Sequence, residues 1–259
     1  LGMKTKQTEY QSEADLEKTF IKQLQNQAYD YLPIHSEKDL IDNLRRQLEK
    51  LNDYHFTDKE WDTFFKQEIA NPNCGIKEKT KIIQEDYKKV LYYEKPVDNC
   101  PFRNILLIDK DNIHNNTLQV INQYETDEGK RANRYDATVL VNGLPLVHIE
   151  LKRRGVDIKD AFNQINRYQN DSFWAGSGLY EFVQIFVISN GTYTKYYSNT
   201  TRQSHISENS GTSSKKGKKT SNSFEFTSWW ADRKNKPIID LIDFAKTFFA
   251  KHTILNILT

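Results

Sequence analysis

The sequence predicts an α/β domain that begins with a helical region. Apolar residues recur three or four positions apart through roughly the first ninety residues, which is typical of amphipathic helices. After Pro96 the pattern changes to short apolar segments typical of strands. Among these, Asn142-Gly143 separates two apolar runs and is a strong signal for a β-hairpin. With 259 residues, 37% of them hydrophobic, the chain can bury a substantial core.

Four helices are expected in the N-terminal region, because each segment carries an apolar stripe along one face. Cap-type residues precede the first, and Thr57 with Glu60 forms a capping-box pattern at the start of the third. The expected helices span residues 12–32, 37–51, 57–69 and 76–92.

Strands dominate the next hundred residues, with one helix among them. Asp157 is a good N-cap for that helix, which follows the hairpin. The expected strands span residues 102–109, 116–124, 134–141, 144–153, 181–189 and 192–197, and the helix spans 157–170.

The remaining chain divides by composition. Residues 199–223 are Ser, Thr, Asn, Gly and Lys with one aliphatic residue, so we expect a flexible polar loop. A last helix is expected over 238–258. The expected divisions are a helical part at 1–95 that contributes the first core helix, a core at 96–200, the loop at 199–223 and a helical segment at 224–259.

The hairpin carries the most informative residues. Asp136 lies on its first strand, and Glu150 and Lys152 share one face of its second strand, because side chains alternate along a strand. Two carboxylates suit Mg²⁺, the backbone carbonyl of Leu151 could add a third ligand, and a lysine stabilises negative charge at a phosphate. Taken alone, the same three residues also fit a surface ladder of ion pairs.

The register of the hairpin tests whether the acids meet. A two-residue loop at Asn142-Gly143 pairs Asp136 with Ile149, which leaves Glu150 on the other face. A three-residue loop pairs Asp136 with Glu150 directly. If the acids share a metal, we expect that loop with its bulge, or another one-residue shift in the hairpin.

Composition excludes several classes of protein. No apolar run is long enough to span a bilayer, and no signal peptide is recognisable. Cys74 and Cys100 fit neither a zinc site nor a disulfide framework, so we expect a reducing cytoplasm. The run from Lys215 to Thr220 lacks the spacing of a P-loop, so we expect no ATP site in this segment. The net charge of +2 points to no partner.

The hairpin and the next helix resemble the N-terminal nuclease domain of the R (restriction, HsdR) subunit of Type I restriction-modification enzymes. The resemblance rests on VNGLPLVHIELK at 141–152 and DAFNQINRY at 160–168, with LQVINQ at 118–123 and VISNG at 187–191, and covers roughly residues 12–200. It implies a PD-(D/E)xK restriction-endonuclease-like core, a mixed central sheet flanked by helices, with Asp136, Glu150 and Lys152 as the motif residues. Tyr135 stands where the motif has proline.

The same resemblance assigns further residues. Gln164 and Tyr168 match the Q-x-x-x-Y motif shared with RecB-like nucleases and would position DNA or the active-site groups. An acid on the first helix near the metal is expected at Glu17, with Glu13 as the rival. His148 shares the face of Glu150, and we prefer it as a neighbour of the site over a metal ligand.

Basic residues surround the motif. Arg153, Arg154 and Lys159 follow the second strand, and Arg131 and Arg134 precede Asp136, so both groups could flank a DNA groove.

The resemblance implies a Mg²⁺-dependent endonuclease domain that cuts double-stranded DNA when an ATP-driven complex stalls. ATP would be needed by the full-length enzyme and bound outside this segment, in a motor domain beyond residue 259. Methyltransferase (M) and specificity (S) subunits would be the partners, in a bacterial or archaeal cytoplasm, with no membrane. Two alternatives stay open: a non-catalytic DNA-binding or assembly module with a nuclease fold, and a RecB-like nuclease that acts on DNA ends.

Overall fold

A seven-stranded mixed sheet forms the centre of the protein. The computed structural model describes residues 11–126, 133–200 and 222–259. The strand order is β1-β4-β5-β6-β7-β8-β9. The pairs β1–β4 and β6–β7 are parallel and the other neighbours are antiparallel. The strands are β1 (Asp30–Tyr31), β4 (Leu118–Thr126), β5 (Asn133–Val141), β6 (Leu144–Leu151), β7 (Ile185–Ser189), β8 (Thr194–Ser198) and β9 (Ser228–Trp229).

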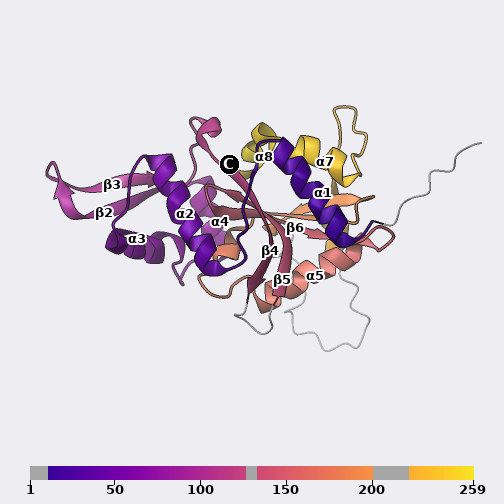
Figure 1. Ribbon diagram of the computed structural model, residues 1–259, viewed down its shortest axis with the longest axis horizontal. Coiled ribbons are helices and arrows are strands. Elements are labelled where there is room, and N and C mark those ends of the chain that lie inside the picture. Colours follow the sequence, from indigo (N-terminus) through magenta and orange to yellow (C-terminus); the bar gives the residue numbers. More distant parts are fainter. Residues whose placement is uncertain (1–10, 127–132, 201–221) are drawn as a thin grey trace, which may run out of the picture.

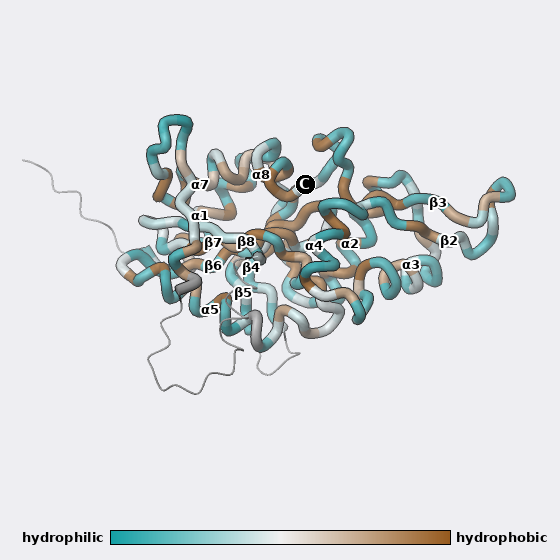
Figure 2. Tube along the Cα trace, turned by 180° about the vertical axis from the view of Figure 1, so that it is seen from behind, coloured by the Kyte–Doolittle hydropathy of each residue, from teal (hydrophilic) through white to brown (hydrophobic). Residues whose placement is uncertain are grey.

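Helices cover both faces of this sheet, which confirms the predicted architecture. In both views the sheet lies between α5 on one side and α1, α7 and α8 on the other (Figures 1 and 2). Phe20 of α1 contacts Phe249 edge to face, which joins the first helix to the C-terminal ones. Apolar segments gather along the central strands, and every residue of β6 is buried (Figure 2). These helices are α1 (Glu13–Asn26), α5 (Ile158–Asp171), α7 (Leu241–Phe248) and α8 (Lys251–Leu258).

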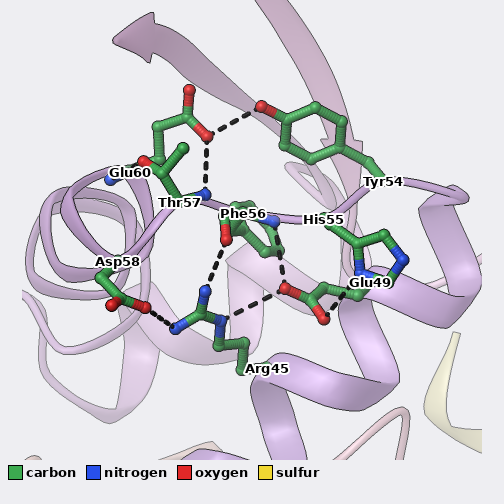
Figure 3. A network of polar contacts seen from close by, with 8 residues as sticks. All are labelled: Arg45, Glu49, Tyr54, His55, Phe56, Thr57, Asp58 and Glu60. Atoms are coloured by element: carbon green, nitrogen blue, oxygen red, sulfur yellow. Dashed lines mark hydrogen bonds and ion pairs between the residues drawn. The ribbon is translucent and has the colours of Figure 1, made fainter.

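The N-terminal region continues away from α5 and ends in a projecting hairpin, β2–β3 (Figure 1). Arg45 of α2 binds Glu49 of the same helix and joins α2 to α3 through the Phe56 carbonyl and Asp58 (Figure 3). The predicted capping box of Thr57 is present. The elements of this region are α2 (Glu37–Asn52), α3 (Asp58–Phe64), the π-helix η1 (Phe65–Ile69), α4 (Ile76–Gln84), β2 (Lys88–Val97) and β3 (Cys100–Leu106). The described residues that follow also form the short 3₁₀ helices η2 (Ile113–Asn115), η3 (Leu179–Phe182) and η4 (Asn222–Phe226). Among the described residues, no helix is both long and apolar enough to cross a membrane.

Two predicted helices are too long. The first ends at Asn26, because Asp30–Tyr31 pairs in parallel with β4. The fourth ends at Gln84, and the aromatic and β-branched residues after it form β2 instead. The turn that closes the β2–β3 hairpin, Asp98-Asn99, has positive φ at both residues, a signal that the sequence analysis missed.

Two later predictions also need correction. The strand expected over 181–189 begins only at Ile185, because η3 occupies Leu179–Phe182. The helix expected over 238–258 is broken between α7 and α8, where Ala250 is extended. The break lets the Phe249 carbonyl accept the Tyr29 hydroxyl at 2.8 Å. The lysine run at 215–219 and most of the predicted 199–223 loop lie outside the described residues.

The β5–β6 hairpin has the one-residue shift that the site requires, but not in the loop. Asn142 and Gly143 both have positive φ and form a two-residue turn, so the three-residue loop is wrong. The shift is a bulge at Leu146, because Leu140 pairs with Pro145 while Val139 pairs with Val147.

Candidate active site

Asp136 and Glu150 come together at the end of the β5–β6 ladder. On the side of the bulge away from the turn, the last strand pair is Ala137 with Ile149. Continuing the same register by one residue sets Asp136 opposite Glu150. The Leu151 amide donates to Asp136 Oδ2 at 2.8 Å. Burial, and then the charge of Glu150, raises the pKa of Asp136 to about 8. Burial likewise raises the pKa of Glu150 to about 8. The hairpin therefore holds two buried carboxyl groups close together, and ionising both at once is energetically unfavourable.

Lys152 is held by a relay from α5. Its Nζ donates to Gln164 Oε1 at 2.5 Å, and Gln164 Nε2 donates to the Tyr168 hydroxyl at 2.5 Å. The Tyr168 hydroxyl lies 2.8 Å from the Arg134 carbonyl and 3.5 Å from Glu150 Oε1. Gln164 and Tyr168 are four residues apart and so lie on one face of the helix. The relay brings together the motif lysine, the motif glutamate and both Q-x-x-x-Y residues.

His148 lies behind Glu150. It is fully buried, and its Nε2 is 3.1 Å from Glu150 Oε2. Both therefore project to the same side of β6, as strand alternation predicts. Four aromatic rings surround the imidazole: Tyr135, Tyr168, Phe173 and Phe186.

Both candidate acids of α1 approach the site. Glu17 is buried, accepts from Asn122 Nδ2 at 2.6 Å and from Gln123 Nε2, and its charge contributes to the raised pKa of Asp136. Glu13 contributes to the raised pKa of Glu150 and lines the pocket beside Asp136.

Gln123 is a residue that the sequence analysis did not single out. It lies on β4 opposite Asp136 in a left-handed conformation, with φ of 51°. The adjacent polar residues Asn122 and Gln123 within a largely apolar strand were the available signal.

A pocket of about 350 Å³ opens in front of Asp136. Arg134 and Arg167 supply positive charge at its wall, and Arg167 was not predicted. Glu13, Asn133, Asp136, Gln164, Tyr168 and Asp171 complete the lining.

The other predicted basic residues lie apart from this pocket. Arg153 is exposed beyond β6. Arg154 donates to Gln11 and Thr192, which ties it to neighbouring segments. The ammonium of Lys159 lies over the Phe224 ring, outside the pocket lining. Arg131 lies outside the described residues.

Comparison with known proteins gives this arrangement a family. The model described as Type I restriction enzyme R protein N terminus matches residues 10–205. This chain belongs to that family. It is 46% identical over 250 residues to the Type I restriction enzyme EcoprrI endonuclease subunit of Escherichia coli, covering 96% of this chain and 73% of that protein. It is 36% identical to the SsaAORF53P endonuclease subunit of Staphylococcus saprophyticus, covering 92% of this chain but 23% of that protein.

An archaeal relative matches a shorter part of the R-subunit domain. The putative MjaIXP endonuclease subunit of Methanocaldococcus jannaschii is 38% identical over 103 residues, 38% of this chain and 10% of that protein. The family resemblance inferred from the hairpin and helix is thereby confirmed, and the mixed sheet flanked by helices is consistent with a nuclease-like domain.

The donor set of this R-subunit domain fits a hard divalent cation. Among residues 11–126, 133–200 and 222–259, no group of three or more His, Cys, Asp or Glu is arranged to hold a metal, so a cation here would draw on two carboxylates and backbone oxygen. Mg²⁺ commonly takes one or two carboxylates and keeps several waters. In an extended strand the N–H and C=O of a residue point to the same side, so the Leu151 carbonyl faces the side of Asp136. Two buried acids with raised pKa values would be relieved by such a charge.

Proposed function

We propose that this R-subunit domain cleaves double-stranded DNA by Mg²⁺-dependent hydrolysis of phosphodiester bonds. The observation that supports this most is the meeting of Asp136 and Glu150 across the bulged hairpin, with Lys152 beside them on the relay.

In the proposed reaction Asp136, Glu150 and the Leu151 carbonyl hold the cation. When bound, Mg²⁺ would polarise the phosphate and lower the pKa of a water molecule. Lys152 stabilises the charge that develops at the phosphate and orients the attacking water. Gln164 fixes the lysine ammonium at 2.5 Å, so that its position does not depend on the DNA.

Two residues support this arrangement. Tyr168 holds Gln164 in place through its hydroxyl. His148, 3.1 Å from Glu150, limits the positions open to that carboxylate.

In the complete enzyme we propose that cutting occurs when an ATP-driven complex stalls. ATP is bound outside this chain, and methyltransferase and specificity subunits are the partners. The chain spans 23% of the length of its staphylococcal relative, and we propose that these activities belong to the longer protein. Arg153 and Arg154 remain proposed DNA contacts, and Glu17 a proposed further acid near the metal.

Substituting Lys152 with alanine in the complete enzyme tests the catalytic role. Loss of one such charge-stabilising group should lower the cleavage rate about a hundredfold or more, while ATP-driven translocation continues. The matched control is Lys66→Ala, which removes an exposed lysine that pairs with Asp62 of α3. Normal cutting by the Lys152 variant would remove that residue from the mechanism.

An alternative is a non-catalytic DNA-binding or assembly module with a nuclease fold. Calorimetry with Mg²⁺ and with Mn²⁺ discriminates, because binding lost in Asp136→Asn and Glu150→Gln supports the nuclease, and no binding supports the module. A RecB-like end nuclease would leave covalently closed circular DNA intact, whereas the proposed endonuclease cuts it.

A further inference from the structure

A second pocket lies at the N-terminal end of α5 and differs in chemistry from the pocket in front of Asp136. Its volume is about 640 Å³, within the range of about 300–1,000 Å³ usual for ligand pockets. Three aromatic side chains line it: Tyr193, Phe224 and Trp229. We refer to it below as the aromatic pocket.

Two of these aromatic side chains are exposed to solvent. Tyr193 is 48% and Trp229 is 42% exposed, and their rings meet edge to face with centroids 6.2 Å apart. Exposed apolar surface gathered around a cavity commonly marks a binding site. Tyrosine and tryptophan offer flat faces on which a nucleobase can stack.

The aromatic pocket also carries positive charge. Lys195 Nζ lies 4.9 Å from the ring centroids of both Phe224 and Trp229. Lys195 is partly buried, and this burial lowers the pKa of its ammonium group. Asp157 also lines the pocket, where its carboxylate accepts the Lys159 amide at 2.9 Å and caps α5. The lysine would therefore gain from an anionic group such as phosphate.

The pocket is connected to the site by the sheet and by α5. The Lys152 amide donates to the Ser189 carbonyl at 2.8 Å, and Asn190 Nδ2 donates to the Val156 carbonyl at 2.7 Å. The loops after β6 and β7 therefore lie together, and both line the pocket. From Ile158, at the pocket, to Gln164, at the site, the helix rises about 9 Å. Successive stacked nucleotides rise about 3.4 Å, so a strand bound at the site reaches the pocket within a few nucleotides.

We propose that the aromatic pocket binds an unpaired nucleobase of the DNA strand next to the bond that is cut. Tyr193 and Trp229 provide the stacking faces, and Lys195 contacts the adjoining phosphate. This inference rests on the proposed nuclease function and adds to it a contact with a locally opened strand. A free mononucleotide shares this chemistry, and the experiment separates the two sources.

The test is binding of fluorescein-labelled hexathymidylate to the 259-residue chain in EDTA, followed by anisotropy. Tyr193→Ala and Trp229→Ala should each weaken binding at least about fivefold, the lower end of what one stacked base contributes. Trp229→Phe, which keeps a ring, should stay within about twofold of the parent. Tyr92→Ala, on the remote β2–β3 hairpin and 68% exposed, is the matched control and should leave binding unchanged.

Two further measurements test the phosphate contact of Lys195 and separate a DNA strand from a free mononucleotide. Lys195→Gln should reduce the slope of log affinity against log salt by about 0.7, as expected for one phosphate contact on a single strand. Thymidine monophosphate should compete far more weakly than the hexamer, and equal competition would overturn the assignment to a strand. Melting temperatures verify that each variant is folded. Parent-like affinity in both alanine variants would overturn the proposal.

Because binding is measured without metal, its failure is separable from that of the proposed function. If DNA is cut but Trp229→Ala leaves the affinity for the hexamer unchanged, only the proposal for the aromatic pocket is overturned. A complete enzyme that never cuts DNA, although its 259-residue domain binds the hexamer through Trp229, overturns the nuclease function alone.

Discussion

Replacing Glu150 by glutamine should stabilise the metal-free protein, although it removes a residue that we assign to the reaction. Glu150 is fully buried, and burial raises the pKa of its carboxyl from 4.5 to about 8. Between these values the unfolded chain is ionised while the folded protein must take up a proton, so folding becomes less favourable as the pH rises. At pH 7 this costs about 3 kcal/mol, because each pH unit above the unfolded pKa is worth about 1.4 kcal/mol.

Because the pKa of Glu150 is raised on folding, its effect on stability changes over a defined range of pH. The contribution of Glu150 to stability is intact below pH 4.5 and is lost progressively up to about pH 8. Glutamine has nearly the same shape and is neutral throughout. The gain in Glu150→Gln should therefore be absent near pH 4, reach about 3 kcal/mol at pH 7 and level off above pH 8.

Glu60→Gln is a matched control that should have the opposite sign. Burial alone would raise the pKa of Glu60, but hydrogen bonds from the Glu94 and Thr57 amides and the Tyr54 hydroxyl outweigh it and lower the pKa. Figure 3 shows the bonds from Thr57 and Tyr54. The ionised form is the stabilising one, so its contribution is present at neutral pH and lost as the pH falls. Glu60→Gln should therefore destabilise the protein at pH 7.

Thermal unfolding of the 259-residue chain in EDTA, from pH 5 to pH 9, measures both effects. A gain of about 3 kcal/mol corresponds to a rise of roughly 6–12 °C in Tm for a domain of this size. Mg²⁺ should then raise the Tm of the parent more than that of Glu150→Gln. If Glu150→Gln is no more stable than the parent between pH 7 and pH 9, while Glu60→Gln behaves as expected, the argument from buried acids is wrong.

Two further substitutions test the packing that positions the site. Gly143→Ala should cost about 3 kcal/mol or more in urea unfolding, because its φ is +85° and the new Cβ would lie 2.6 Å from the Leu44 Cα. Gly155→Ala, with φ of +87° and open space around it, should lose only about 1 kcal/mol, and equal losses would contradict the close approach. Lys79→Met should cost about 3 kcal/mol by leaving Glu181 without its 2.8 Å partner. Adding Glu181→Gln should restore part of that loss, and no restoration would argue against a charge effect.

Much of the fold could be predicted from local patterns. The helix over 37–51 was predicted almost to the residue, because its apolar stripe is regular, and the structure adds that Ser36 caps it. The Asn142-Gly143 turn was also predicted, because few residue pairs tolerate two consecutive positive φ angles. In contrast, β1 at Asp30–Tyr31 has only two residues and exists through its pairing with β4.

The candidate site divides in the same way. The sequence by itself determined the residue types, the shared face of Glu150 and Lys152, and the helical spacing of Gln164 and Tyr168, because these depend on neighbours within a few positions. It also restricted the hairpin to a register that needed one extra residue.

Only the tertiary structure decided where that residue is placed and what surrounds the acids. The bulge is at Leu146, and Gln123 of β4 lies opposite Asp136. The raised pKa values of Asp136 and Glu150 follow from burial beneath distant segments and from charges on α1, more than one hundred residues earlier in the chain. Burial and electrostatic interactions depend on distance in space, and a linear pattern does not contain that distance.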